Sequence, residues 1–181
     1  VEERSYPYRG QGIRIPTLEE VFLEFPDIRI NVEIKQADPP IVEKLGELID
    51  EYDRWDRTLI ASFDADTMLA FRERWPQAAT SAVEPEVRRF FTLNLLFLGR
   101  FYRSPAAAFQ VPNRFGNLHV IRPRFVRIAN RRGADVHGWT PNTEEAIQEM
   151  IDDGVQGIIT DRPDIAMRLL GRDPGTVPAA P

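Results

Sequence analysis

The sequence predicts an α/β fold, a TIM-type (β/α)8 barrel that is incomplete. Strand-like and helix-like segments alternate about six times along the chain, which is the order of a parallel sheet with right-handed crossovers. Segment 28–35 alternates between apolar and polar residues, whereas an interior strand of an open doubly wound sheet would be apolar on both faces. A closed barrel takes about 250 residues. The 181 residues therefore predict a barrel that lacks about its first two strands.

Each element of the first half rests on a local pattern. A capping box that starts at Thr17 begins the first helix, the alternation marks the first strand, and apolar residues at helical spacing mark the next helix. A second apolar run is a strand, Asp64 caps the helix after it, and a short apolar run follows. In chain order these are a loop at 1–16 and elements at 17–25, 28–35, 39–52, 58–63, 64–75 and 78–83.

The second half continues the same alternation. It starts with an apolar helix that has arginines at its ends, which predicts a crossover helix packed on the barrel rather than a membrane-binding segment. Gly133 and Gly154 end two later helices, Asn142 with Glu145 is expected to cap the second of these, and Asp161 is expected to cap the last helix of the chain. In chain order the elements are 86–102, 108–111, 123–132, 136–140, 142–153, 155–160 and a final helix. The partial barrel thus spans 17–172, and the Pro- and Ala-rich residues 173–181 are a predicted disordered tail.

The composition excludes several kinds of partner and chemistry. The 28 acidic and 23 basic residues give a net charge of −5, which argues against nucleic acid as a partner. The absence of cysteine excludes disulfides, a thiol nucleophile and a thiolate zinc site, so a hard cation bound by oxygen is the expected metal. No apolar run is long enough to span a bilayer, and the first residues do not form a signal peptide, which favours a cytoplasmic protein.

The first strand carries the strongest candidate site. Its polar residues Asn31, Glu33 and Lys35 share one face, and its apolar residues, expected against the helices, share the other. Active sites of parallel barrels are built at the carboxyl ends of the strands, so Glu33 and Lys35 are expected to point into the lumen there. His137 and Trp139 share a face of a later strand, and His119 is expected to be a loop residue.

Five segments, in order along the chain, resemble the glycerophosphodiester phosphodiesterase family. Any one of them would be weak evidence, because a Pro-Thr-Leu-Glu-Glu run is simply a good helix start. Their common order over about 150 residues makes the resemblance specific. The segments are residues 14–20 (RIPTLEE), 31–35 (NVEIK), 62–63 (SF), 136–142 (VHGWTPN) and 154–164 (GVQGIITDRPD).

The resemblance implies a role for each candidate residue. Glu33 would be one of three acidic ligands of a divalent cation, Ca²⁺ or Mg²⁺, which prefer oxygen ligands. Lys35 would contact a nonbridging phosphate oxygen and stabilise developing charge. Trp139 would border the glycerol or alcohol part of the substrate. His137 is a further candidate for substrate binding, and the alternative is that it is a hydrogen-bonded residue inside the lumen. The implied reaction hydrolyses a small glycerophosphodiester to sn-glycerol 3-phosphate and an alcohol.

Several family motifs are absent from the sequence. The resemblance assigns the general acid and base to two histidines, one of them in a His-Arg-Gly motif, and the other two metal ligands to a Glu-x-Asp motif on the second strand. Because neither motif occurs here on a strand ahead of Pro16, the 181 residues alone are expected to be inactive. Segments 28–35 and 155–160 are expected to be open edge strands, awaiting an N-terminal segment or another chain.

Two other functions fit the same residues. A catalytically dead relative could keep the scaffold as a binding module, and the motifs upstream would distinguish it from an enzyme. A related barrel could act as a lysophospholipase D or a sphingomyelinase D. The sequence does not separate these activities, because contacts to the head group come from variable loops.

Overall fold

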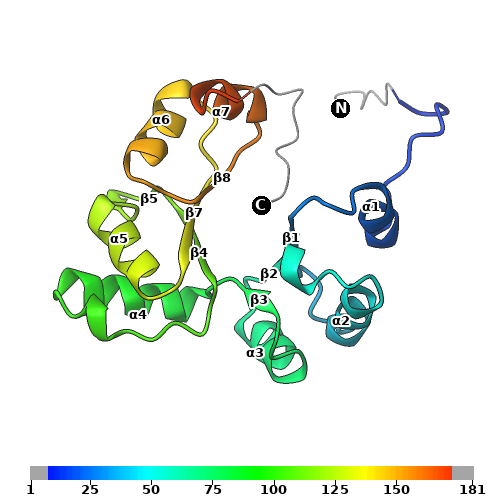
Figure 1. Ribbon diagram of the computed structural model, residues 1–181, viewed down its shortest axis with the longest axis horizontal. Coiled ribbons are helices and arrows are strands. Elements are labelled where there is room, and N and C mark those ends of the chain that lie inside the picture. Colours follow the sequence, from blue (N-terminus) through cyan, green and yellow to red (C-terminus); the bar gives the residue numbers. More distant parts are fainter. Residues whose placement is uncertain (1–7, 173–181) are drawn as a thin grey trace, which may run out of the picture.

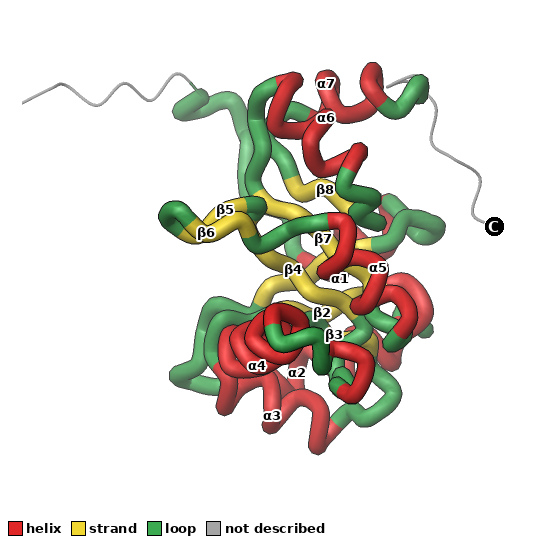
Figure 2. Tube along the Cα trace, turned by 90° about the vertical axis from the view of Figure 1, so that its left-hand side faces the viewer, coloured by secondary structure: helices red, strands yellow, loops and turns green. Residues whose placement is uncertain are grey.

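The structure, a computed structural model, describes residues 8–172. The predicted tail 173–181 and the first part of the predicted loop 1–16 lie outside the described residues. Parallel strands run through the middle of the molecule, and helices cover their outer side (Figures 1 and 2). The parallel strands are β1 (Ile30–Glu33), β2 (Thr58–Ala61), β3 (Ala79–Thr80), β4 (Ala108–Pro112), β7 (Asp135–Trp139) and β8 (Gly157–Ile159).

The strands form two three-stranded sheets, with the orders β1-β2-β3 and β4-β7-β8. A single parallel bridge between Ser81 and Ala108 joins the sheets. Two backbone hydrogen bonds support it, from Ala82 N to Ala108 O at 2.8 Å and from Ala107 N to Thr80 O at 2.8 Å. Each parallel strand is therefore the neighbour of the parallel strand that follows it in the chain, as in a β/α barrel.

The array does not close within the described part of the chain. There, β1 pairs only with β2, and β8 pairs only with β7. This confirms the expected pair of open edges and the incomplete barrel.

The helices pack on the outer face of the strands, and the hydrophobic core lies between the two layers. In the first half, Ile60 of β2 packs with Met68 and Phe71 of α3, all three fully buried. In the second half, Phe90 of α4 stacks on Phe109 of β4 with ring centroids 4.6 Å apart. The helices are α1 (Leu18–Glu24), α2 (Val42–Glu51), α3 (Ala65–Arg74), α4 (Glu84–Leu95), α5 (Pro123–Arg131), α6 (Glu144–Asp152) and α7 (Pro163–Leu169).

The predicted helix 86–102 is wrong in its second half. Helix α4 ends at Leu95, the chain turns at Phe97 with φ +62°, and a separate 3-10 turn, η2 (Gly99–Phe101), follows. Residues 86–102 contain no proline, and their apolar periodicity favours one long helix although Gly99 weakens it. The break is fixed by packing, because a Cβ at Gly99 would lie 3.2 Å from Cγ2 of Ile128 on α5.

Two other predictions need correction. The strand predicted at 78–83 is only the two residues of β3 followed by the Ser81 bridge. A hairpin of β5 (Arg114–Phe115) and β6 (Leu118–His119) was not predicted, and it turns at Gly116 with φ +56°. His119 therefore lies in a hairpin strand rather than in a loop.

The caps of the last two helices also differ from expectation. Thr143, not Asn142, caps α6 and accepts a hydrogen bond from Ala146 N at 3.3 Å. Arg162, not Asp161, is the N-cap of α7. Asn142 and Asp161 instead bond to each other, with Asn142 Nδ2 donating to Asp161 Oδ2 at 2.8 Å. This bond ties the loop after β7 to the loop after β8.

No helix in the described residues combines the length and the apolar character needed to cross a membrane.

Candidate active site

An open cavity of about 520 Å³ lies at the carboxyl ends of the strands. The last residues of five parallel strands line it, which follows from the alternation of side chains along each strand. Further walls come from the loops after β2, β3 and β7, from α4 and from the β5–β6 hairpin. The five terminal strand residues are Glu33, Ala61, Pro112, Trp139 and Ile159.

Glu33 points into this cavity, as its place in the β1 alternation requires. Ile30 and Val32 pack against the helix-side core, so their neighbours in sequence face the lumen. The Glu33 side chain is 32% exposed, and its Oε2 lies 3.6 Å from Lys35 Nζ. A solvent-exposed pair of this kind contributes roughly 0–1 kcal/mol to stability, so stability does not account for the placement of the two charges.

Lys35 follows the end of β1 and does not line the cavity itself. Its side chain is 78% exposed and reaches back toward Glu33. The ammonium group therefore stands at the mouth of the cavity, beside the carboxylate, with freedom to reorient.

Ser62 holds the turn that follows Glu33. Its buried hydroxyl donates to Ile34 O at 3.0 Å and accepts from Asp64 N at 3.1 Å. Ile34 N also donates to Ala61 O at 2.7 Å. These bonds fix the ends of β1 and β2 relative to each other, which explains structurally why a serine stands at this position.

A polar layer lies one step deeper in the lumen. Gln110 Nε2 lies 3.1 Å from Asn31 Oδ1 and 3.3 Å from His137 Nδ1, so it bridges residues from β1 and β7. Burial lowers the pKa of His137, and nearby Asp135 opposes that shift. Burial thus favours the neutral imidazole, whose Nδ1 can accept from the Gln110 amide.

His137 lies below the cavity rather than in its wall. A Cβ at Gly157 of the neighbouring strand would approach Cδ2 of the imidazole to 2.6 Å, so the ring occupies the space that glycine leaves. The ring is thus seated between Gln110 and Gly157.

Trp139 stands at the mouth and forms an aromatic pair with Phe63. The ring centroids are 6.4 Å apart in an edge-to-face arrangement, and both residues line the cavity. Phe63 is exposed although it is a large aromatic residue. The pair provides an apolar wall on the solvent side of the cavity.

Sequence reasoning gave no site role to Gln110 or to Phe63, although Phe63 belongs to the segment 62–63 that resembles the family. Gln110 is the polar residue within an apolar strand, which is the same alternation that identified Glu33. Phe63 follows the end of the second strand, where barrel sites are built. The contact of Gln110 with Asn31 and that of Phe63 with Trp139 join residues far apart in sequence, so no local pattern could predict them.

The described residues do not make a complete cation site. They include no group of three or more His, Asp or Glu side chains able to hold a metal ion. Glu33 could supply one carboxylate ligand, and Lys35 beside it is a cation rather than a ligand.

An array of parallel β/α units, with a cavity built from the last residues of its strands, defines the class of parallel β/α barrels. The chain belongs to the glycerophosphoryl diester phosphodiesterase family, whose family profile matches residues 1–165. This match confirms the family resemblance that the five sequence segments indicated. Together with the open sheets, it also confirms the prediction of an incomplete TIM-type barrel.

Individual relatives agree with this assignment. The chain is 32% identical over 166 residues to the Mycobacterium tuberculosis protein named "Probable glycerophosphodiester phosphodiesterase 2", covering 89% of this chain and 62% of that protein. It is 24% identical to a mouse lysophospholipase D, covering 89% of this chain and 58% of the relative. The chain thus spans less than two thirds of the length of these relatives.

The fold is also found among solved structures. The glycerophosphoryl diester phosphodiesterase domain of an uncharacterized Mycobacterium tuberculosis protein matches with a TM-score of 0.73 and 16% identity, over 93% of this chain and 68% of that chain. At this identity the likeness shows the fold alone.

Proposed function

We propose that this chain is the carboxyl-terminal part of a phosphodiesterase that hydrolyses glycerophosphodiesters to sn-glycerol 3-phosphate and an alcohol. The observation that carries the proposal is the position of Glu33, the last residue of β1, in the cavity wall of a barrel of this family. Its carboxylate would provide one ligand of Ca²⁺ or Mg²⁺, and the remaining ligands would come from outside the described residues.

The other site residues support the same chemistry. Lys35 Nζ, 3.6 Å from the Glu33 carboxylate, can reach a phosphate placed in the mouth of the cavity. Its positive charge would stabilise a phosphoryl oxygen that gains negative charge in the transition state. Trp139 and Phe63 would border the glycerol or alcohol portion. His137 would help to bind substrate only through the polar layer, because it does not reach the cavity wall.

The acid and base of the reaction are proposed to lie on β/α units that pair with the open edges of β1 and β8. The chain's two histidines fit neither role, because His137 lies below the cavity and His119 lies on the hairpin near Glu149 and Asp153. Without those units the chain would bind its metal weakly and turn over no substrate.

The test is an assay of the complete enzyme, meaning this chain together with the β/α units proposed to pair with its open edges. Release of sn-glycerol 3-phosphate from glycerophosphocholine is measured in Ca²⁺ and in Mg²⁺ for wild type, Glu33→Gln and Lys35→Met. Matched controls are Glu47→Gln and Lys44→Met on α2, which carry the same substitutions away from the cavity. We expect losses of about 100-fold or more for the site variants and unchanged rates for the controls.

Two outcomes would contradict the proposal. Full activity of Glu33→Gln at limiting metal concentration would remove Glu33 from the metal site. A folded complete protein that binds glycerophosphocholine but does not cleave it would assign the barrel to the dead binding modules.

A lysophospholipase D activity is the second candidate, and the cavity wall favours it. Several apolar side chains, among them Phe91, Phe115 and Leu118, line the cavity beside the polar end of β1. Such a wall can accept an acyl chain, and the mouse relative is named for that activity. Lysophosphatidylcholine and glycerophosphocholine are therefore assayed side by side, and the ratio of kcat/KM values distinguishes the two.

A further inference from the structure

The charge of this chain is unevenly distributed along the sequence. Residues 87–132 contain ten arginines and no aspartate, glutamate or lysine, whereas the other residues hold 13 of the 23 basic side chains and all 28 acidic ones. A block of one sign on a chain of opposite net charge marks a surface for an oppositely charged partner. The arginines are Arg88, Arg89, Arg100, Arg103, Arg114, Arg122, Arg124, Arg127, Arg131 and Arg132.

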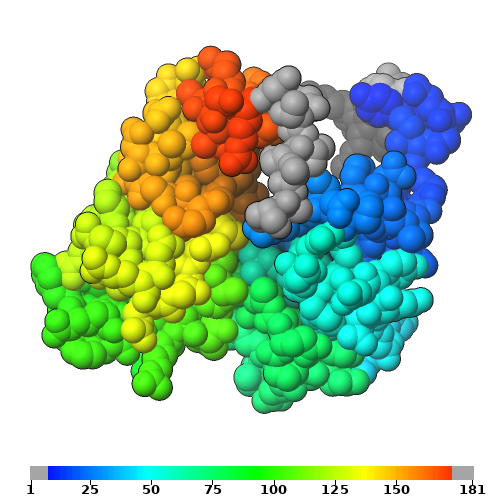
Figure 3. Space-filling view, viewed as in Figure 1, coloured from blue at the N-terminus to red at the C-terminus, as the bar shows by residue number. Residues whose placement is uncertain are grey.

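This basic segment occupies one side of the molecule. It comprises most of α4, η2, β4, the β5–β6 hairpin and α5. In Figures 1 and 3 its green to yellow residues lie on the side opposite the blue and cyan residues of the first half. Within the described part of the chain, only Arg88 and Arg114 of the ten arginines form ion pairs. Most of this positive charge is therefore available to an external anion.

Large apolar side chains are exposed in the same segment, where α4 gives way to η2. Leu96, Phe97 and Phe101 are 61%, 73% and 65% exposed, and Leu95 and Leu98 are exposed as well. Phe97 also has φ +62°, a conformation that bulky residues rarely adopt. An exposed aromatic ring held by unfavourable backbone indicates a role outside the folded chain.

Guanidinium groups lie against these exposed rings. Arg124 lies 3.7 Å from the centroid of the Phe97 ring, and Arg100 lies 4.6 Å from that of Phe101. Arg124, Arg127 and Arg131 follow one another on α5 at spacings of three and four residues, so they form one stripe. We call Leu95–Leu98, Arg100, Phe101 and these three arginines the basic apolar patch.

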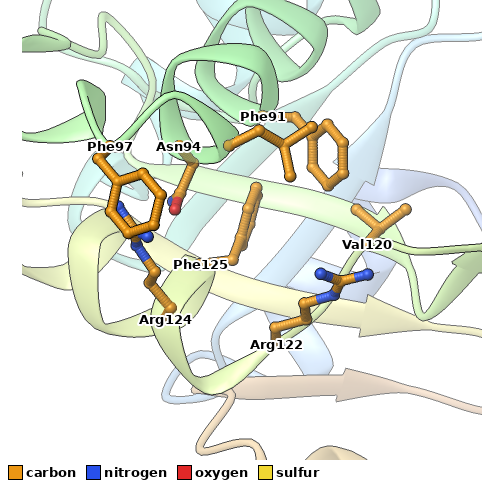
Figure 4. Close-up of a pocket in the computed structure, with 8 residues that line it drawn as sticks. Phe91, Asn94, Phe97, Val120, Arg122, Arg124 and Phe125 are labelled. Carbon is orange, nitrogen blue, oxygen red and sulfur yellow. The ribbon is translucent and has the colours of Figure 1, made fainter.

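A pocket of about 200 Å³ lies at the base of this patch (Figure 4). Its walls are largely aromatic and aliphatic, and Arg122 and Arg124 supply its charges. Asn94, which is 7% exposed, lines it, and its Nδ2 has no hydrogen-bond partner in the structure. A buried amide N–H group without a protein partner normally donates a hydrogen bond to a ligand or a water molecule. The pocket thus offers an N–H donor and two cations beside an apolar wall.

The pocket and the candidate active site adjoin each other. Phe91 and Val120 line both the pocket and the larger cavity. A partner seated on the basic apolar patch would therefore lie next to the wall of the cavity that Phe91 and Val120 form.

We propose that the basic apolar patch docks this protein onto the surface of a bilayer that contains anionic phospholipid. This departs from the expectation for segment 86–102 alone, because the arginine stripe beside its exposed apolar residues comes from α5. Phe97, Phe101 and the leucines enter the boundary between head groups and acyl chains, and the arginine stripe contacts phosphates. A lipid phosphate lies between Arg122 and Arg124, with an ester carbonyl on Asn94 Nδ2.

The chemistry of the patch separates a bilayer from other anions. Nucleic acid is read by polar side chains and stacked rings, and a run of exposed leucines adds nothing to such contacts. A second copy of the chain docked patch to patch would bring arginine against arginine, which is repulsive.

The test measures binding of the purified protein to vesicles by flotation. Vesicles of phosphatidylcholine alone are compared with vesicles containing phosphatidylglycerol at about a third of the lipid. The net charge of −5 opposes binding to anionic lipid, so preferential binding there identifies a local basic surface. We expect at least tenfold preference for the anionic vesicles and a loss of that preference in high salt.

Two variants separate the apolar from the charged part of the patch. Phe97→Asn should weaken binding about tenfold while keeping or raising the melting temperature, because asparagine tolerates the left-handed backbone. Arg127→Glu should weaken binding at least about fivefold. The controls are Leu23→Ser, an exposed leucine on α1, and Lys44→Glu, which makes the same charge change on α2.

Several results would overturn the proposal. Equal binding to both kinds of vesicle would do so, as would site variants that bind like their controls. Equally tight binding of duplex DNA would show a general polyanion surface, and self-association abolished by Arg127→Glu would assign the patch to a second copy.

Discussion

Replacing Arg72 tests how the two sheets are held together. Arg72 of α3 donates from Nε to Thr80 Oγ1 at 2.9 Å, from Nη2 to Ser81 O at 3.0 Å, and to both carboxylate oxygens of Glu86 at 2.6 and 3.1 Å. Glu86 in turn accepts from Val83 N at 3.0 Å. One side chain thus connects α3, the end of β3 and the start of α4, at the point where the first sheet meets the second.

The magnitude follows from the burial of this pair. The Arg72 and Glu86 side chains are each only 19% exposed. Removing one partner of a largely buried ion pair lowers the free energy of unfolding by about 3–5 kcal/mol. Because both side chains keep some exposure, we expect Arg72→Met to lower it by about 3 kcal/mol. With a urea m-value of about 2 kcal/mol per molar, the unfolding midpoint should fall by about 1.5 M.

The assay is urea unfolding followed by circular dichroism and tryptophan fluorescence. Arg88→Met is the matched control, because it removes the same charge from a solvent-exposed pair with Glu84 one helical turn away. That variant should lose only about 0.3–0.5 kcal/mol. If the two variants shifted the midpoint equally, the ion pair at the sheet junction would not be stabilising and the reasoning would fail.

Three further predictions concern glycine packing and pH. Gly157→Ala should destabilise the fold by about 1–3 kcal/mol, because the new methyl group meets the His137 ring, and a melting temperature equal to wild type would contradict this. Since burial lowers the pKa of His137, its contribution to stability should fall as pH drops below about 6.5; denaturation midpoints between pH 8 and 5 should therefore decline less steeply in His137→Gln. Bonds from Arg14 and Thr17 lower the pKa of Glu20 to about 2, so its stabilisation is present above about pH 4.5 and lost on acidification toward pH 2. A Glu20→Gln variant with unchanged acid sensitivity would refute that assignment.

The alternation of side chains between the two faces of a strand made part of the site predictable. Because side chains alternate along a strand, the apolar residues of 28–35 fixed the helix side, and Glu33 then had to face the lumen. The order of strands and helices likewise predicted that successive parallel strands would be neighbours. Both inferences depend only on local sequence and general topology rules.

Other features depended on contacts between distant residues. The bridge from Gln110 to Asn31 joins residues 79 apart in sequence, and no local pattern specifies it. Helix α4 ends at Leu95 because η2 must pack against α5 at Gly99, although the apolar run itself favours helix. The turn at Gly116 was a local signal for the hairpin, because glycine readily adopts the left-handed backbone there.

The separation of charge along this chain also affects the rate at which molecules arrive. A basic side facing an acidic remainder gives the protein a large electric dipole, which turns it before contact and draws small anions toward the basic side. The cavity adjoins that side, so an anionic phosphodiester would approach along the attractive field, past Arg88 in the cavity wall. Because the screening length is only about 8 Å in physiological salt, this acceleration would fade as ionic strength rises. A salt-dependent kcat/KM at constant kcat would be its kinetic signature.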